Sequence, residues 1–278
     1  MNGQKSRLTD AFRRAGHPLL VPYAVGGYPD LDSCKDILRT YREAGAGIIE
    51  IGVPFSDPLA DGPVIQAASQ VALRAGIRPG DVLDLAEEAA GSGVPVVLLT
   101  YLNTILAYHP ARFFADCGRK GVAGVVVPDV PVEEAADLQR AARECGVDVV
   151  LLAAPTSTEP RLARIAAAAS GFIYCVSTTG VTGARAALRA DLPEFVARVR
   201  RHTSLPLAVG FGVSTAEQAG AVARYADGII IGSALVDIVR KSESVELALP
   251  GLRSFLEEAG QAIAAGETAG GAAAGVSE

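Results

Sequence analysis

Short apolar stretches alternate along this chain with stretches of helical periodicity. Eight of the apolar stretches are runs rich in β-branched residues, which is typical of strands buried on both faces of a parallel sheet. They are Leu19–Gly26, Gly47–Val53, Pro95–Tyr101, Gly124–Val130, Asp148–Ala154, Gly171–Ser177, Pro206–Gly212 and Gly228–Gly232. Between most of them, the helical spacing of apolar residues predicts amphipathic helices. These helices are Ser33–Ala44, Asp81–Ala90, Val132–Glu144, Glu159–Ala169, Pro193–His202 and Thr215–Tyr225.

Alternating strand and helix signals indicate parallel strands joined by crossover helices. Eight such units in about 250 residues fit an α/β fold of the (β/α)8 TIM barrel type better than a doubly wound sheet. Three further helices are predicted: Leu8–Ala15 below the barrel, Val64–Ala75 inside the second unit, and Ser233–Val239 after the eighth strand. The catalytic domain is therefore expected to span 1–265, with a disordered Gly/Ala-rich tail at 266–278.

Composition narrows the class of protein. A chain of 278 residues, half of them hydrophobic, can bury a large core, whereas a net charge of -6 argues against a nucleic-acid surface. The N-terminus has no apolar signal core, and no 18-residue apolar run predicts a membrane span. Four cysteines lie far apart without a Cys-x-x-Cys pair, which disfavours zinc and a disulfide framework. We expect a soluble protein of the reducing cytoplasm.

The second predicted strand carries a carboxylate, and the loop after it carries two more. Glu50 lies within an apolar run, where an unpaired carboxylate costs several kcal/mol or takes up a proton. This cost is tolerable for a group that exchanges protons near neutral pH, so Glu50 is the first candidate for a general acid/base. A purely structural carboxylate is the alternative. Asp61 is a second candidate, although an Asp before a Gly also stabilises turns.

Three glycine-rich segments follow the sixth, seventh and eighth strands, at Gly180–Gly183, Gly210–Ser214 and Gly232–Ser233. Any one of them fits an ordinary tight turn. In a TIM barrel, however, the loops after the last two strands and the start of a short extra helix form the usual phosphate site. The N-terminus of the predicted helix Ser233–Val239 would offer free N–H groups to the anion. Together the segments predict a phosphate-binding site.

Other mechanisms find no support in the residues. None of the four lysines lies in a predicted strand, the three histidines are scattered without metal-ligand spacing, and no Gly-x-Ser-x-Gly elbow is present. Other polar residues at strand ends are Asn103, Asp129, Tyr174 and Ser177. What remains is proton transfer by carboxylates on a phosphorylated substrate, without a metal or a cofactor in this chain.

The segment Glu50–Pro63 resembles the most specific motif of the tryptophan synthase alpha chain family. Val181-Thr182-Gly183 and Gly210-Phe211-Gly212 extend the resemblance, which runs from Val21 to Ser233. It implies cleavage of indole-3-glycerol phosphate to indole and glyceraldehyde 3-phosphate in tryptophan biosynthesis. It also implies a partner, the pyridoxal phosphate-containing beta chain, in an αββα heterotetramer. The loops around Pro54–Asp61 and Asn103–His109 would face that partner.

The same resemblance implies roles for individual residues. Glu50 would be the acid/base, Asp61 would accept the indole N–H, Tyr174 would lie beside Glu50, and Thr182 would close over the site and meet Asp61. The phosphate would rest on Gly183, Gly212, Gly232 and Ser233. The indole pocket would be lined by Tyr23, Ile65, Leu99 and Phe211, although a plain core role fits each of these as well. Two departures are visible, since Tyr23 stands where Phe is common and Thr178 where many relatives carry Arg.

Three other functions remain open at this point. The chain could be a free-standing indole-3-glycerol phosphate lyase, which would not respond to a beta chain. It could be a regulatory or binding subunit, which the set Glu50, Asp61 and Tyr174 disfavours. It could also be a barrel for a different sugar phosphate, in which case indole-bearing ligands would not bind.

Overall fold

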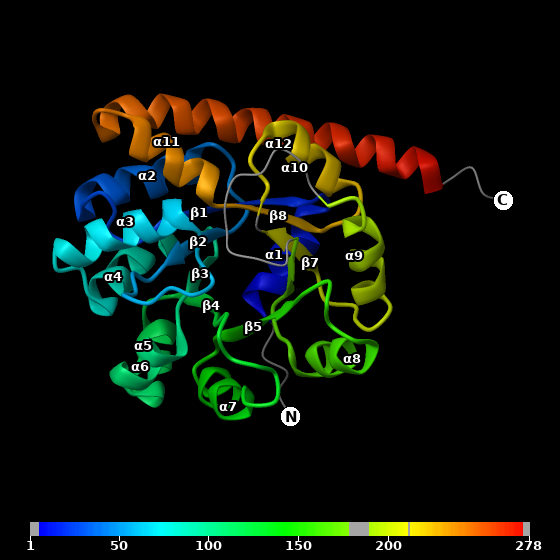
Figure 1. Cartoon of the computed structure of the whole chain (residues 1–278), viewed down its shortest axis with the longest axis horizontal. Helices are drawn as coiled ribbons and strands as arrows, with labels where there is room; N and C mark the ends of the chain where they lie inside the picture. Colours follow the sequence, from blue (N-terminus) through cyan, green and yellow to red (C-terminus); the bar gives the residue numbers. More distant parts are fainter. Residues whose placement is uncertain (1–5, 178–188, 211, 275–278) are drawn as a thin grey trace.

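Eight parallel strands form a closed barrel in the computed structural model, in the order β1 to β8 with β8 paired back to β1 (Figure 1). The structure describes residues 6–177, 189–210 and 212–274, with side chains up to residue 267. The strands are β1 (Leu19–Val25), β2 (Ile49–Gly52), β3 (Val96–Leu99), β4 (Val122–Val126), β5 (Asp148–Ala153), β6 (Ile173–Val176), β7 (Leu207–Gly210) and β8 (Gly228–Ile231). The predicted fold class is confirmed.

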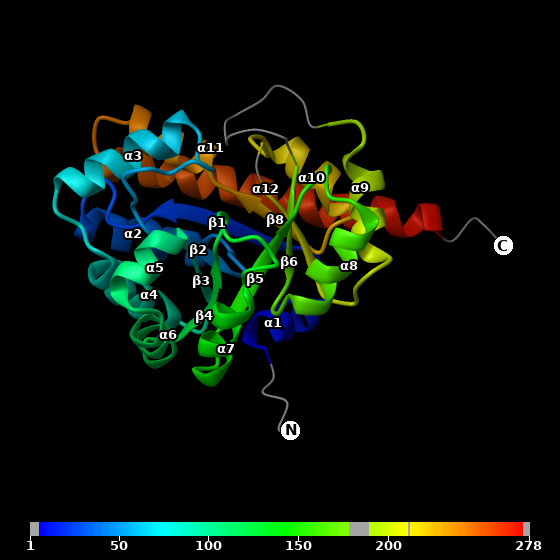
Figure 2. The ribbon, with the colours of Figure 1, turned by 60° about the horizontal axis from the view of Figure 1, so that its bottom comes forward.

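Helices surround the barrel on its outside (Figure 2). They are α1 (Arg7–Ala15), α2 (Leu31–Glu43), α3 (Pro63–Arg74), α4 (Pro79–Ala90), α5 (Leu102–Tyr108), α6 (Pro110–Arg119), α7 (Ala136–Glu144), α8 (Glu159–Ala168), α9 (Leu192–Arg200), α10 (Ala216–Ala223), α11 (Ser233–Lys241) and α12 (Val245–Ala274). Helices α5, α6 and α12 lie outside the predicted set. In the described part of the chain, no helix is long and apolar enough to cross a membrane.

Helix α1 covers the bottom of the barrel, as predicted. Ser6 caps its N-terminus by accepting from the Thr9 N–H at 3.0 Å, and the Thr9 hydroxyl donates to the Gly171 carbonyl at 2.7 Å. A Cβ on Gly124 of β4 would lie 2.6 Å from a methyl carbon of Leu8, so that leucine fills the space below the strand. The apolar face of α1 thereby closes the N-terminal end of the barrel.

Helix α12 passes the predicted start of the disordered tail at residue 266 and continues to Ala274 (Figure 1). Alanine favours helix, and packing against α10 adds to it. Gly266 is buried against Gly220 of α10, where an added Cβ would lie 2.2 Å from the Gly220 carbonyl oxygen. Helix α12 thus extends past residue 265, and residues 275–278 lie outside the described ones.

We expect Gly266→Ala to lower the free energy of unfolding by about 1–3 kcal/mol, because the new methyl group meets backbone rather than a movable side chain. Urea denaturation followed by circular dichroism measures the change. Gly260→Ala in the same helix is the matched control, since a Cβ there meets nothing within 4 Å. It should stabilise by about 0.5–1 kcal/mol through helix propensity. Equal effects of the two substitutions would contradict the close packing of α10 and α12.

Candidate active site

Glu50 lies in β2 between β1 and β3, with Tyr23 and Val97 as its Cα partners in register. Its side chain is 2 % exposed. It interacts electrostatically with the phenol of Tyr174 in β6, across the barrel. Because β2 and β6 are not adjacent strands, this interaction runs through the barrel interior, so the carboxyl group faces inward. The structure thus places Glu50 in the barrel interior, and its role as an acid/base stays a prediction.

Burial controls the protonation of Glu50. Desolvation, with a smaller contribution from the negative charge of Asp61, raises its pKa to about 8. One carboxyl oxygen, Oε1, is buried without a hydrogen-bond partner in the described part of the chain. A buried polar atom without a partner is costly, and such atoms gather where a ligand completes the bonding. Glu50 is therefore a carboxylic acid that retains its proton at neutral pH and faces an unfilled bonding position.

Asp61 is held by the loop between β2 and α3. Its N–H donates to the Pro58 carbonyl at 3.0 Å, and its carbonyl accepts from the Gln66 side chain at 2.8 Å. The Tyr101 hydroxyl donates to its Oδ2 at 3.1 Å. Burial raises the pKa of Asp61 to about 6, and the Tyr101 hydrogen bond opposes that rise. Asp61 is thus ionised at neutral pH, whereas Glu50 is protonated.

Tyr101, at the end of the third predicted strand, is a site residue that sequence reasoning missed. Its hydroxyl also accepts from the Ala60 N–H at 3.1 Å, and its ring stacks on Phe55 at 5.0 Å between centroids. It therefore ties the loop that carries Asp61 to the end of β3. The available signal was an aromatic residue at the C-terminal end of a barrel strand, where functional residues gather.

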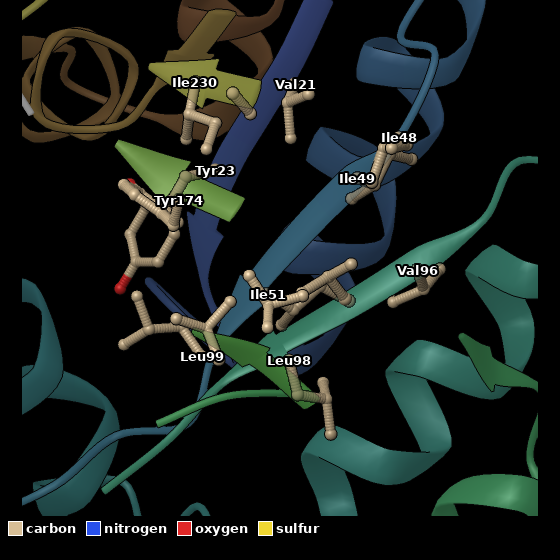
Figure 3. Close-up of a cluster of buried hydrophobic side chains, with 14 of the residues drawn as sticks. Val21, Tyr23, Ile48, Ile49, Ile51, Val96, Leu98, Leu99, Tyr174 and Ile230 are labelled. Atoms are coloured by element: carbon tan, nitrogen blue, oxygen red, sulfur yellow. The ribbon is translucent and has the colours of Figure 1, made fainter. Parts of the chain in front are cut away.

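Tyr174 and Tyr23 complete the interior of the site (Figure 3). Both are buried, and burial together with Glu50 and Asp61 raises the pKa of each phenol well above its usual range. A Cβ on Gly210 would lie 2.2 Å from the Tyr174 hydroxyl, so the ring needs glycine on the neighbouring strand. The structure thus brings Tyr174 near Glu50, as the resemblance implies.

Only part of the predicted phosphate site lies among the described residues, and the start of α11 belongs to that part. Gly232 is the N-cap, and no side chain caps the helix, so the N–H groups of Ser233 and Ala234 keep their bonding capacity for an anion. Gly212 has φ 84°, a left-handed backbone that favours glycine. Gly183, Thr182 and Phe211 lie outside the described residues. Their assigned roles remain predictions.

The remaining predicted residues divide into core and surface. Ile65 and Leu99 are buried at the start of α3 and the end of β3. Ser177 is fully buried at the end of β6. Asp129 is exposed, and its carboxylate accepts from the N–H of Leu102, the first residue of α5. It therefore caps a helix, and its charge acts on the phenol of Tyr101. Asn103 is exposed on α5.

No group of three or more His, Cys, Asp or Glu side chains that could hold a metal is found among the described residues. All four cysteines are free thiols.

Comparison with known proteins decides the family. Residues 10–263 match the tryptophan synthase alpha chain family. The chain belongs to this family. A tryptophan synthase alpha chain from Roseiflexus castenholzii is 47% identical over 246 residues, which is 87% of this chain and 94% of the relative. One from Citrifermentans bemidjiense is 45% identical over 265 residues, or 94% of this chain and 99% of the relative.

Solved structures of the tryptophan synthase family agree with the barrel. A chain of tryptophan synthase from Mycobacterium tuberculosis superposes with a TM-score of 0.86 at 38% identity, covering 93% of this chain and 98% of that chain. Tryptophan synthase subunit alpha from Legionella pneumophila gives a TM-score of 0.86 at 30% identity, covering 94% and 99%. The chain therefore has the function of a tryptophan synthase alpha chain, a carbon–carbon lyase that cleaves indole-3-glycerol phosphate in tryptophan biosynthesis. Alpha chains need no cofactor.

Proposed function

We propose that Glu50 and Asp61 divide the work of this cleavage as proton donor and fixed charge. The observation that carries the proposal is the separation of their pKa values, about 8 for Glu50 and about 6 for Asp61. Two carboxyl groups whose environments separate their pKa values take opposite roles in acid–base catalysis. Near neutral pH Glu50 has a proton to give, and Asp61 has a negative charge to offer.

The reaction needs an electron sink, and the substrate's own indole ring serves as one. Glu50 protonates ring carbon C3, which leaves positive charge on the ring, and Asp61 stabilises that charge by accepting the ring N–H. The bond between C3 and the adjoining glycerol carbon then breaks, and its electron pair returns to the ring. The hydroxyl on that carbon becomes the aldehyde of glyceraldehyde 3-phosphate, and its proton passes to Glu50. Glu50 ends the cycle protonated, as it began.

The other site residues hold the substrate. Gly212, Gly232 and Ser233 would bind the phosphate through N–H groups, with Gly183 as a further member of the site. Tyr23, Ile65 and Leu99 would enclose the indole together with Phe211. Tyr174 would hold Glu50, and Thr182 would close over Asp61. The support for this assignment is the burial of Tyr23, Ile65, Leu99 and Tyr174, and the uncapped start of α11.

We also propose an αββα heterotetramer with a pyridoxal phosphate-containing beta chain. Two large apolar side chains support a partner on the face carrying the site: Leu59 is 74% exposed in the loop before α3, and Leu106 is 51% exposed on α5. Both lie in the segments expected to face the beta chain. Among the solved relatives, that from M. tuberculosis is described as tryptophan synthase. Cytoplasmic location remains a prediction from composition.

Indole release from indole-3-glycerol phosphate tests the activity and the partner together. The purified chain is assayed alone and with a beta chain, leaving out serine so that indole accumulates. We expect slow release alone and a strong rise with the beta chain. Fast release that does not respond to the beta chain would favour a free-standing lyase. No release under either condition would overturn the assigned chemistry.

A further inference from the structure

The Tyr23 hydroxyl occupies a defined place in the site. Tyr23 in β1 is the register partner of Glu50 in β2. A Cβ on Gly52, two residues after Glu50, would lie 2.1 Å from the Tyr23 hydroxyl oxygen. Because residues two apart in a strand share a face, Glu50 and Gly52 both face the barrel interior. The hydroxyl therefore takes the place of the missing side chain at Gly52, next to Glu50 on the side of the barrel's C-terminal end.

The ring of Tyr23 reaches from there to the start of the phosphate helix. A Cβ on Gly232 would lie 3.4 Å from ring carbon Cδ1 and 3.6 Å from the tyrosine Cβ. Gly232 is the N-cap of α11. The side chain thus spans from the predicted phosphate position at its base to the neighbourhood of Glu50 at its tip. A substrate with its phosphate on α11 and its reacting carbon at Glu50 must pass its glycerol chain along this side chain.

The tip of Tyr23 is available to a ligand. Its main-chain carbonyl accepts from the Tyr41 hydroxyl at 3.1 Å, which fixes β1 against α2. The residue as a whole is 4% exposed, but its hydroxyl oxygen is not among the fully buried polar atoms without a partner in the described part of the chain. The hydroxyl of a buried tyrosine usually has a hydrogen-bond partner, and an oxygen of the substrate can take that place here.

The charges facing Tyr23 keep this donor protonated. Asp61, Glu50, Tyr101 and Tyr174 all interact with its phenol, and burial acts in the same direction, so its pKa lies well above its usual value. The phenol is consequently a hydrogen-bond donor across the whole working range of pH. It does not exchange protons in the reaction.

We propose that Tyr23 is a further catalytic residue, whose hydroxyl donates a hydrogen bond to the glycerol hydroxyl oxygen that becomes the aldehyde oxygen. This inference rests on the proposed roles of Glu50 and of the phosphate helix. The oxygen gains partial negative charge while its proton passes to Glu50, and a fixed donor stabilises charge that develops in the transition state. No proton leaves Tyr23, so the balance of the cleavage is unchanged.

Tyr23→Phe removes only the oxygen and retains the ring packed near Gly232. We expect kcat/KM for indole-3-glycerol phosphate, measured with the beta chain present, to fall by roughly 10-fold, the effect of one hydrogen bond to a partly charged oxygen. An analogue with the indole ring, a three-carbon chain without hydroxyls and the phosphate should bind Tyr23→Phe and the parent chain with the same Kd. Tyr225→Phe, at the far end of the barrel near β8, is the matched control and should leave both quantities unchanged.

Three results would overturn the inference. An unchanged kcat/KM in Tyr23→Phe would show that the hydroxyl has no role. An equal loss for substrate and analogue would place the effect in the packing of the indole ring. A shifted pH profile of kcat/KM would show that the hydroxyl acts through Asp61 or Glu50. Failure of the proposed function is separate, because then the parent chain itself releases no indole.

Discussion

Glu50→Gln lowers the rate of indole release by at least ~10²-fold, the usual effect of removing a general acid/base. The amide retains the size of the side chain but can neither give its proton to the ring nor accept one from the glycerol hydroxyl. The loss should fall on kcat, with KM changed little, because the missing interaction belongs to the transition state. Steady-state kinetics with a beta chain present measures both quantities.

The control for this substitution makes the same chemical change on the outside of the barrel. Glu43 on α2 is paired with Arg253 at the surface, with their side chains 42% and 43% exposed. Glu43→Gln should retain normal turnover. Turnover of Glu50→Gln within a few-fold of the parent chain would remove Glu50 from the mechanism, provided that its circular dichroism spectrum matches that of the parent.

Glu50 also makes the stability of the free chain depend on pH. Its pKa is about 8 in the folded chain against 4.5 as the ordinary value, and that of Asp61 is about 6 against 3.8. Folded pKa values that lie above the unfolded ones mean that the native state holds more protons. The contribution of these two groups to the free energy of unfolding is therefore greatest below about pH 3.8, falls as pH rises, and levels off above about pH 8. The fall amounts to on the order of a few kcal/mol.

Glu50→Gln isolates this contribution, because its amide does not ionise. Urea denaturation of both chains at a series of pH values gives the difference in their unfolding free energies, from which the other titrating groups cancel. We expect the stability of the variant relative to the parent chain to increase as pH rises between about 4.5 and about 8, because over this interval Glu50 is ionised in the unfolded chain and protonated in the folded one. A difference that stays constant across this range would mean that the Glu50 pKa is not raised by folding.

The functional residues that can be predicted from the sequence are those whose chemistry conflicts with their local surroundings. A carboxylate inside an apolar strand marks Glu50, and glycines after the last strands mark the start of α11. Continuous apolar runs predict buried parallel strands so directly that all eight appear in the structure. At such sites the residue type differs from what the local structure favours, and this difference is recognisable from the sequence alone.

Tyr101 and the hydroxyl of Tyr23 could not be found in this way, because a tyrosine in a strand or just after one satisfies every local rule. Their importance arises from tertiary distances: 3.1 Å from the Tyr101 hydroxyl to Asp61, and a hydroxyl in the space above Gly52. Helix α12 is hidden for another reason. Pro250 and Gly251 predict a helix end, and the helix continues past them while packing against α2, α10 and α11.

The contacts of α1 set the order in which the chain can be completed during synthesis. This helix is synthesised before every strand of the barrel. Its hydrogen bond to Gly171 nevertheless requires a residue made 162 positions later, and the hydroxyl of its cap Ser6 donates to Asp148. Strand β1 acquires its second pairing partner later still, because that partner is β8, which ends at Ile231. Until then Leu8, Phe12 and one edge of β1 stay without their native partners. The packing of α1 against the bottom of the barrel and the pairing of β8 with β1 therefore form only after most of the chain has been translated.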